Sequence, residues 1–443
     1  MTVSFVQELL ALFAGIALII LLTTRYRVHA FFALLIACFV TGIGVQLPLA
    51  NLLGVVKDGF GNIMKSLGLI IILGTTMGVL LEHTGSTRVM ANYILKKVGE
   101  KNSAFALSLT GFIVGLPVFC DSGFIVLNGL NKSLSKKAAI SIAITSVSLA
   151  TGLYAVHCLI PPHPGAAAAA GIIGADYGKL ILYGVIIAIP AMLIGHWWAV
   201  YAGKKITLTE VEQEEVIEDT SDQPSVLQAF LPVIIPILLI AVRSFFINDD
   251  LSETGWLGNV LLLGEPVVAL SIGVLLAFAG KRNWQQATVS HLLQDSVEKA
   301  GGILVIIGAG GAFGAVLAAT KLGVHFSEVF ALNTLGILFP FLVTFLLKTA
   351  QGSSTVAIIT AASIVQPLLP ALGLDTANGK LLAVLSMGAG SMMISHANDA
   401  YFWVITKFSG LDIRTTLKVY SVASILMGLT TLLMVYLFSL LLS

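Results

Sequence analysis

The polar residues that could do chemistry in this chain lie inside apolar sequence. Within "GLPVFCDSGFIVL", which covers residues 115–127, Asp121 and Ser122 stand between the helix breakers Pro117 and Gly123. Because burial in apolar surroundings disfavours the charged form of a carboxyl group, Asp121 is a candidate carrier of a coupling proton. A structural cap of a hairpin is the alternative interpretation of this residue.

Three further polar interruptions occur in apolar sequence: "VHCLIPPHPG" (156–165), "KTAQGSST" (348–355) and "SHAND" (395–399). The three prolines of the first interruption remove backbone donors and prevent a continuous helix. Broken helices leave free N–H groups at their positive ends, which suit a carboxylate. Hydroxyl and amide side chains in these interruptions could bind hydroxyl groups of the same ligand. They are Ser122, Ser353, Ser354, Thr355 and Asn398.

The interruptions also contain charged and titratable side chains. His157 and His396 could contact a substrate or a proton, or could fix the breaks by hydrogen bonds to the backbone. His163 lies between prolines, which favours a structural role. Lys348 is a candidate charge partner for an anion, with snorkelling to water as the alternative. Asp399 is a second candidate proton carrier or charge partner.

No catalytic or cofactor-binding constellation is predicted. The His, Asp and Ser residues recur in a repeated pattern, rather than as one nucleophile with one base. A metal site formed by His157, His163 and His396 is the weaker alternative, and we expect no metal and no cofactor. "GAGGAFG" (308–314) lacks the GxGxxG spacing and no strand precedes it, which favours close helix packing. We therefore expect a protein that is not an enzyme.

The composition predicts a multi-pass protein of the lipid bilayer. Of 443 residues, 57% are hydrophobic and 11% are charged, against about a quarter charged in soluble proteins. Several apolar runs approach the roughly 20 residues that a helix needs to cross hydrocarbon. A net charge of +1, with no basic patch, argues against a nucleic-acid partner.

The apolar runs predict an all-α fold with five spans in each half. The expected spans cover 5–24, 28–46, 62–82, 139–174, 178–203, 227–246, 259–280, 300–320, 380–409 and 416–442. Two glycine- and proline-containing stretches, 104–134 and 333–370, are either re-entrant hairpins or pairs of further crossings. An acidic segment divides the halves and is typical of a linker. The predicted organisation is therefore 1–205, a cytoplasmic linker at 206–225, and 226–443.

The two halves resemble each other. Similar residues recur in the same order at a nearly constant offset, including Asp58 with Asp295, and His157 with His396. An odd number of spans in each half requires the second copy to be inverted. Inverted repeats with interrupted helices that meet at the membrane midplane are typical of secondary transporters. A channel would need a continuous polar pore, which the sequence does not indicate.

The most specific segment is "VHCLIPPHPGAAAAAGIIGADYGKLILYG" (156–184), supported by "FCDSGFIVL", "GSSTVAIITAA" and "SHANDAYFWV". With these motifs the chain resembles, nearly from end to end, the gluconate permease family of gluconate:proton symporters, in the ion-transporter superfamily. The resemblance implies proton-coupled uptake of a sugar acid or small hydroxycarboxylate across a bacterial inner membrane. By superfamily analogy it also implies a homodimer with an elevator-like transport domain.

Two residues depart from the family pattern. Lys348 stands where members often have arginine, which keeps the charge but loses the bidentate geometry for a carboxylate. Asp121 stands where some members have glutamate, which shortens the side chain by one methylene. These departures leave open a permease for D-serine or a short hydroxy acid. A separate alternative is a sodium-coupled carboxylate symporter, which would use backbone carbonyls and Ser and Thr oxygens at the hairpin tips.

Overall fold

The computed structural model describes residues 5–99, 102–204, 206, 223–246, 256–281, 283–320 and 334–442. Within these residues every regular element is a helix, as the composition predicts. The predicted linker at 206–225 lies outside the described residues, apart from 206 and 223–225.

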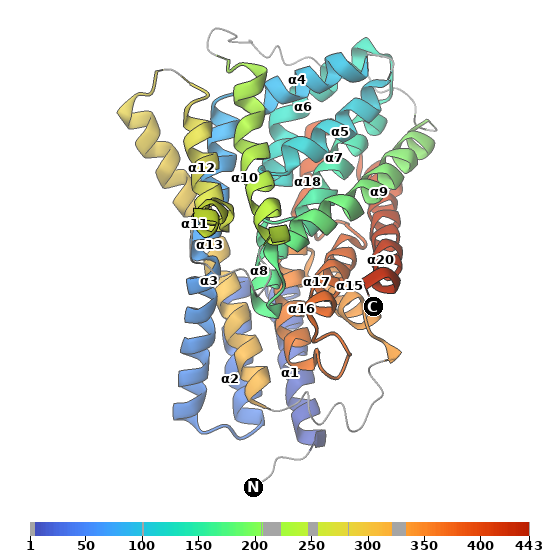
Figure 1. The fold of residues 1–443 in the computed structure, drawn as a ribbon. Coiled ribbons are helices and arrows are strands. Elements are labelled where there is room, and N and C mark those ends of the chain that lie inside the picture. The colour runs from blue at the N-terminus through green and yellow to red at the C-terminus, as the bar shows by residue number, and fades with distance from the viewer. Residues whose placement is uncertain are drawn as a thin grey trace.

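The first half of the chain contains nine helices within the described residues (Figure 1). They are α1 (Phe5–Thr24), α2 (Ala30–Gly44), α3 (Leu49–His83), α4 (Ser86–Val98), α5 (Ser103–Gly115), α6 (Cys120–Lys137), α7 (Ile142–Leu159), α8 (Pro164–Ile173) and α9 (Tyr177–Gly203).

The second half follows a similar order. It contains α10 (Val226–Phe246), α11 (Trp256–Leu261), α12 (Pro266–Phe278), α13 (Gln286–Ala319), α15 (Leu338–Gln351), α16 (Ser354–Val365), α17 (Ala377–Met392), α18 (Ala400–Ser409), α19 (Ile413–Thr416) and α20 (Val422–Leu442). A π-helical segment, η5 (Leu417–Ser421), joins α19 to α20.

Corresponding helices in the two halves pack in a reciprocal way. In each half a helical hairpin (α5–α6 or α15–α16) precedes an interrupted helix (α7–α8 or α17–α18). Helix α8 packs on α16 of the other half, and α18 packs on α6. In Figure 1, α1 and α2 lie towards the lower end, whereas α10 and α12 lie towards the upper end. The division into two repeats and the inversion of the second stay predictions.

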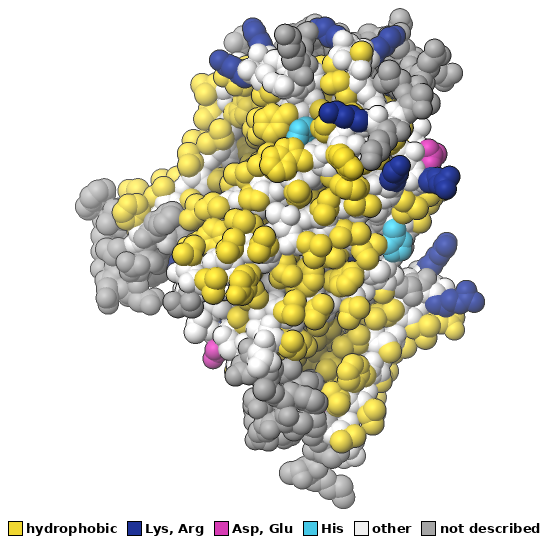
Figure 2. All heavy atoms as spheres, turned by 90° about the vertical axis from the view of Figure 1, so that its right-hand side faces the viewer, with side chains coloured by type: hydrophobic (Ala, Val, Ile, Leu, Met, Phe, Trp, Pro, Cys, Tyr) yellow, Lys and Arg dark blue, Asp and Glu magenta, His cyan; other side chains and the backbone are white. Residues whose placement is uncertain are grey.

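Seven helical segments of the described chain are long and apolar enough to cross a membrane, which fits a multi-pass membrane protein. Hydrophobic side chains cover most of the face in Figure 2, with Lys and Arg mainly along its top and one side. The hairpin arms α5, α15 and α16 have 13, 14 and 12 residues. At 1.5 Å per residue each is shorter than a hydrocarbon core of about 30 Å, which favours re-entrant hairpins over full crossings.

Two predicted spans are much shorter than the helices that contain them. Helix α3 begins at Leu49 rather than near residue 62, and α13 begins at Gln286 rather than near residue 300. Lys57 and Asp58 interrupt the apolar run, but both are exposed, while Leu52 and Val56 on the same helix are buried. The polar residues therefore mark one face of a long amphipathic helix rather than its start.

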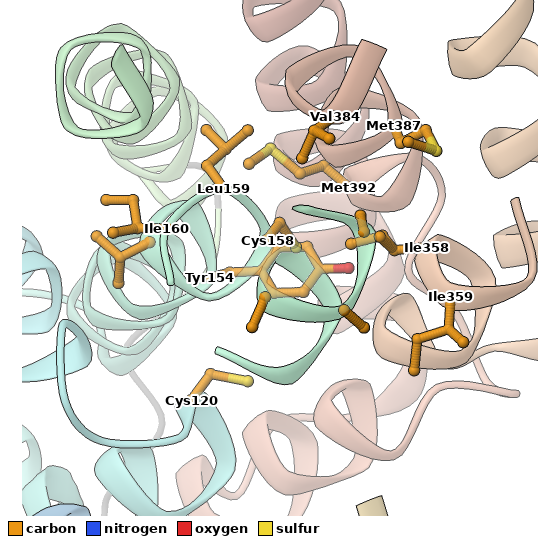
Figure 3. Packing of buried hydrophobic residues seen from close by; sticks show 14 of the residues in the cluster. Cys120, Tyr154, Cys158, Leu159, Ile160, Ile358, Ile359, Val384, Met387 and Met392 are labelled. Carbon is orange, nitrogen blue, oxygen red and sulfur yellow. The ribbon is translucent and has the colours of Figure 1, made fainter. Parts of the chain in front are cut away.

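Buried side chains from both halves surround Tyr154 (Figure 3). Cys120 of α6 and Cys158 of α7 lie near it, as do Ile358 of α16 and Met387 of α17. The Tyr154 hydroxyl donates a hydrogen bond of 2.9 Å to the carbonyl of Ser391. The core thus joins the hairpins to the interrupted helices.

Candidate functional site

The hairpin tip and the helix break of the first half are adjacent. Helix α5 ends at Gly115 and α6 begins at Cys120, with Pro117 between them. Helix α7 ends at Leu159, ahead of a proline pair that cannot donate backbone hydrogen bonds. His163 is buried and donates from Nε2 to the carbonyl of Gly115 over 2.6 Å. This bond fixes the tip to the break, as expected for a structural histidine.

In the second half, a glycine ends the first arm of the hairpin. Gly352 has φ +84°, a left-handed conformation that favours glycine, and a Cβ atom there would overlap the carbonyl of Asn398. Helix α16 then begins at Ser354, and the Ser353 side chain accepts from the backbone N–H of Val356. The tip of this hairpin is therefore packed directly against the α17–α18 break.

The two predicted charge partners bind each other. The Lys348 Nζ lies 2.7 Å from an Asp399 carboxylate oxygen, and both residues are buried. Lys348 also donates to the carbonyl of Gly352, and Ser395 donates to the Asp399 carboxylate. The other carboxylate oxygen of Asp399 accepts from the backbone N–H of Tyr401 over 3.0 Å. Both charges are thus compensated within the second half.

Asp121 lies close to this ion pair, although it comes from the first half. It occupies the first turn of α6, is half-buried, and is close enough to interact electrostatically with both Asp399 and Lys348. The Cys120 thiol lies 3.7 Å from its carboxylate. The structure therefore brings the predicted acidic and basic residues of both halves into one region.

The two repeated histidines differ in their surroundings. His157 Nδ1 is buried and has no hydrogen-bond partner among the described residues. The ring lies 4.9 Å from that of His163 and within electrostatic reach of Lys348. His396 instead donates from Nε2 to the carbonyl of Thr349 over 3.3 Å. A histidine could fix a helix break by a hydrogen bond to the backbone. His396 makes such a bond, whereas Nδ1 of His157 makes none among the described residues.

The predicted hydroxyl and amide ligands come from the two hairpins and from the second helix break. Asn398 donates to the carbonyl of Thr349 over 2.8 Å, so it also connects the break to α15. Ser354 is buried in the first turn of α16. A Cβ atom on Gly165 would lie 3.3 Å from the Cα of Thr355, which places Thr355 where α8 meets α16.

Two polar residues near the site were missed in the sequence. Glu82 lies at the end of α3, close enough for its carboxylate to interact with the Ser122 side chain. The only sequence signal for Glu82 is a carboxylate at the end of the apolar run "MGVLLEH". Gln351, the last residue of α15, has a buried amide. It stands beside the predicted residues in "KTAQGSST", but no pattern distinguished it from a loop residue.

The helices that follow the hairpin tips and the helix breaks are capped differently in the two halves. The N-cap residues of α6 and α8, Phe119 and His163, provide no side-chain hydrogen bond. Their rings lie 6.1 Å apart. In contrast, Ser353 caps α16 and Asp399 caps α18 with their side chains. No side-chain cap therefore pairs with the first-turn N–H groups of α6 and α8.

A cavity of about 470 Å³ lies elsewhere, between the start of α5, the α6–α7 connection and the end of α9. It is lined by residues that include Phe105, Ser141 and His196, and by none of the predicted site residues. The described residues contain no cluster of His, Cys, Asp and Glu suited to a metal ion.

Comparisons with known proteins agree with the motifs. The model of the GntP family permeases matches residues 7–441. The gluconate permease of Pseudomonas aeruginosa is 33% identical over 437 residues and covers 96% of each chain. The Gnt-II system L-idonate transporter of Escherichia coli (strain K12) is 30% identical over 437 residues, or 96% of this chain and 98% of that one. The crystal structure of the Alcanivorax borkumensis YdaH transporter shares the fold, with a TM-score of 0.62 at 16% identity over 89% of this chain and 90% of that one. This chain therefore belongs to the GntP permease family, and is a multi-pass membrane transporter rather than an enzyme.

Proposed function

We propose that the protein imports a sugar acid such as gluconate, or a related small hydroxycarboxylate, together with a proton across a bacterial inner membrane. The relatives named for gluconate and L-idonate support this substrate class. The observation that carries the proposal is the position of Asp121, in the first turn of α6, which begins without a side-chain cap, and close to the Lys348–Asp399 pair.

The substrate carboxylate would bind at the N-termini of α6 and α8. Both helices begin without a side-chain cap, and His163 fixes the tip that precedes α6 to the break that precedes α8. Backbone N–H groups at two positive helix ends stabilise one negative charge. Lys348 is less suited to this role because Asp399 already compensates its charge.

Asp121 would couple the proton to the substrate by electrostatic competition. An ionised Asp121 in the first turn of α6 places a negative charge at the helix end that the substrate carboxylate needs. Two like charges at this distance disfavour each other, so protonation of Asp121 makes substrate binding more favourable. Binding of the proton and binding of the anion then support one another, which is the requirement for symport.

The remaining predicted residues would contact the substrate chain. We assign hydroxyl contacts to Ser122, His157, Ser353, Ser354, Thr355, His396 and Asn398. The unpaired Nδ1 of His157 supports its inclusion. For His396 and Asn398 the free parts of the side chain would act, because His396 already donates one bond to α15 and Asn398 donates two.

Transport would require the hairpins and interrupted helices to move against the long helices, as an elevator, in a homodimer. Two glycines of α3 support such movement, because they allow close approach to the interruptions of the first half. A Cβ atom on Gly74 would lie 2.9 Å from Pro162, and one on Gly78 would lie 2.8 Å from the carbonyl of Pro117. At Gly74 and Gly78, α3 has no side chain that would block movement of these interruptions along it.

Uptake of radiolabelled gluconate into proteoliposomes tests the proposal. An inward proton gradient should increase uptake, and Asp121→Asn should abolish this increase. Asp375→Asn makes the same change at an exposed position outside the site and should behave as wild type. Proton-independent accumulation by Asp121→Asn would remove Asp121 from the mechanism.

Two further arms distinguish the alternatives. Varying sodium at fixed pH separates proton coupling from a sodium-coupled symporter. Competition by L-idonate, D-serine and short hydroxy acids identifies the substrate class. Stronger inhibition by D-serine or a short hydroxy acid than by gluconate would favour the alternative permease.

A further inference from the structure

Gln351 has a buried side-chain amide that the described protein leaves unpaired. Both Nε2 and Oε1 are inaccessible to solvent, and neither has a hydrogen-bond partner among the described residues. Most buried side-chain polar groups have partners, and those that lack them require an explanation. A ligand that binds the amide is one such explanation.

The position of Gln351 on α15 directs it towards the site. Residues three apart on a helix lie on the same face, so Gln351 shares a face with Lys348. Lys348 binds Asp399 and lies within electrostatic reach of Asp121 and His157. His157 Nδ1 in the same region is also buried and unpaired. Unpaired polar groups from both halves, among them those of Gln351 and His157, thus lie around the same ion pair.

The chemistry of the amide indicates what it binds. A carboxamide is uncharged and offers both donors and an acceptor. A carboxylate or an ammonium group would satisfy only one of these functions, and an alkyl chain would satisfy neither. A hydroxyl group both donates and accepts, so neighbouring hydroxyls of a polyhydroxy chain would satisfy the whole amide.

We propose that Gln351 is a specificity-determining residue that selects a hydroxylated carbon chain by binding substrate hydroxyl groups. The proposal rests on the proposed function, which places a sugar acid in this site. Gln351 would hydrogen-bond to hydroxyl groups on the carbon chain of the acid, and the uncapped N-termini of α6 and α8 would bind its carboxylate. A site that hydrogen-bonds a hydroxyl discriminates strongly against analogues that lack it, because its polar groups are then left unpaired.

Calorimetric binding to the purified full-length protein tests this assignment. The ligands are gluconate, L-idonate and the monodeoxy analogues of gluconate, and the variants are Gln351→Leu and Gln366→Leu. Gln366 is also half-buried but lies just beyond the far end of α16, so its replacement controls for the loss of a glutamine amide outside the site. We expect Gln351→Leu to weaken gluconate binding by about tenfold to a hundredfold, and Gln366→Leu to leave it unchanged.

The analogues identify the contact itself. At least one monodeoxy analogue should bind the wild-type protein about tenfold more weakly than gluconate does. The Gln351→Leu variant should bind this analogue and gluconate with equal affinity. The assignment would be overturned if Gln351→Leu bound gluconate with wild-type affinity. It would also be overturned if the loss of affinity from Gln351→Leu and the loss from removing each hydroxyl simply added for every analogue. Either result would leave the proposed function intact, whereas wild type that binds neither gluconate nor L-idonate would end both. If Gln351→Leu does not fold by size exclusion and thermal unfolding, Gln351→Met gives the same comparison with an unbranched side chain.

Discussion

Lys348 and Asp399 are 51 residues apart in the chain, yet they form a buried ion pair of 2.7 Å that joins the second hairpin to the second helix break. Lys348 also donates a hydrogen bond to the carbonyl of Gly352, and Asp399 accepts hydrogen bonds from Ser395 and from the backbone N–H of Tyr401. The pair connects two segments whose ends border the proposed substrate site.

Loss of either partner of this pair should destabilise the protein strongly. Lys348→Met or Asp399→Leu leaves a buried charge without compensation, which costs about 3–5 kcal/mol. The double variant removes both charges and should recover much of the stability. Thermal unfolding of the purified variants measures the effect.

A second ion pair offers a matched control. Lys299 and Asp295 lie 2.9 Å apart, but their side chains are 42% and 35% exposed. Lys299→Met should cost less than about 1 kcal/mol, because exposed pairs contribute little. Similar losses for Lys348→Met and Lys299→Met would show that burial of the first pair is unimportant.

Gly352→Ala should disturb the second hairpin by two separate effects. A left-handed conformation costs a non-glycine residue about 1–2 kcal/mol, and the new Cβ would also overlap the carbonyl of Asn398. Gly373→Ala isolates the first effect, because Gly373 has φ +68° and no neighbour within 4 Å of a built Cβ. The melting temperature should fall further for Gly352→Ala, and equal shifts would contradict the predicted overlap.

Asp121→Asn should separate exchange from accumulation. Asparagine resembles the protonated aspartate, so gluconate can still bind and exchange across the membrane, but no proton is carried. We expect counterflow of labelled gluconate in preloaded proteoliposomes to persist while accumulation driven by a proton gradient is lost. Asp121→Glu keeps the carboxyl group and should retain both activities. Loss of counterflow in Asp121→Asn alongside normal folding would contradict the competition between Asp121 and the substrate.

The cap of α19 should contribute a pH-dependent stability. Two hydrogen bonds from Thr415 to the Asp412 carboxylate lower the pKa of Asp412. The bond from the backbone N–H has the larger effect, and the bond from the hydroxyl the next largest. A group whose pKa is depressed on folding stabilises the protein above its unfolded pKa, near 3.9, and this contribution is lost as the pH falls through the folded pKa. The difference in melting temperature between wild type and Asp412→Ala should therefore be largest near neutral pH and shrink in acid. A difference that grows on acidification would reverse the predicted sign.

Much of the helical architecture could be predicted from the sequence. Runs of apolar residues are required by hydrocarbon, and glycine and proline end helices through local backbone properties, as at Pro117 and Gly352. The starts of α3 and α13 could not be predicted in this way. Lys57 and Asp58 resemble a loop in the sequence, and only packing of the opposite face decides that the helix continues through them.

The candidate site shows the same division. The sequence by itself determined where polar residues interrupt apolar helices, because that pattern depends on residue type and on the cost of burying polar groups in lipid. It also determined the family, through motifs that run along nearly the whole chain. Only the tertiary structure decided that Lys348 binds Asp399, that Glu82 lies close to Ser122, and that the amide of Gln351 is left unpaired. These relationships depend on which helices pack together across long separations in the chain, and no local property of the sequence encodes that choice.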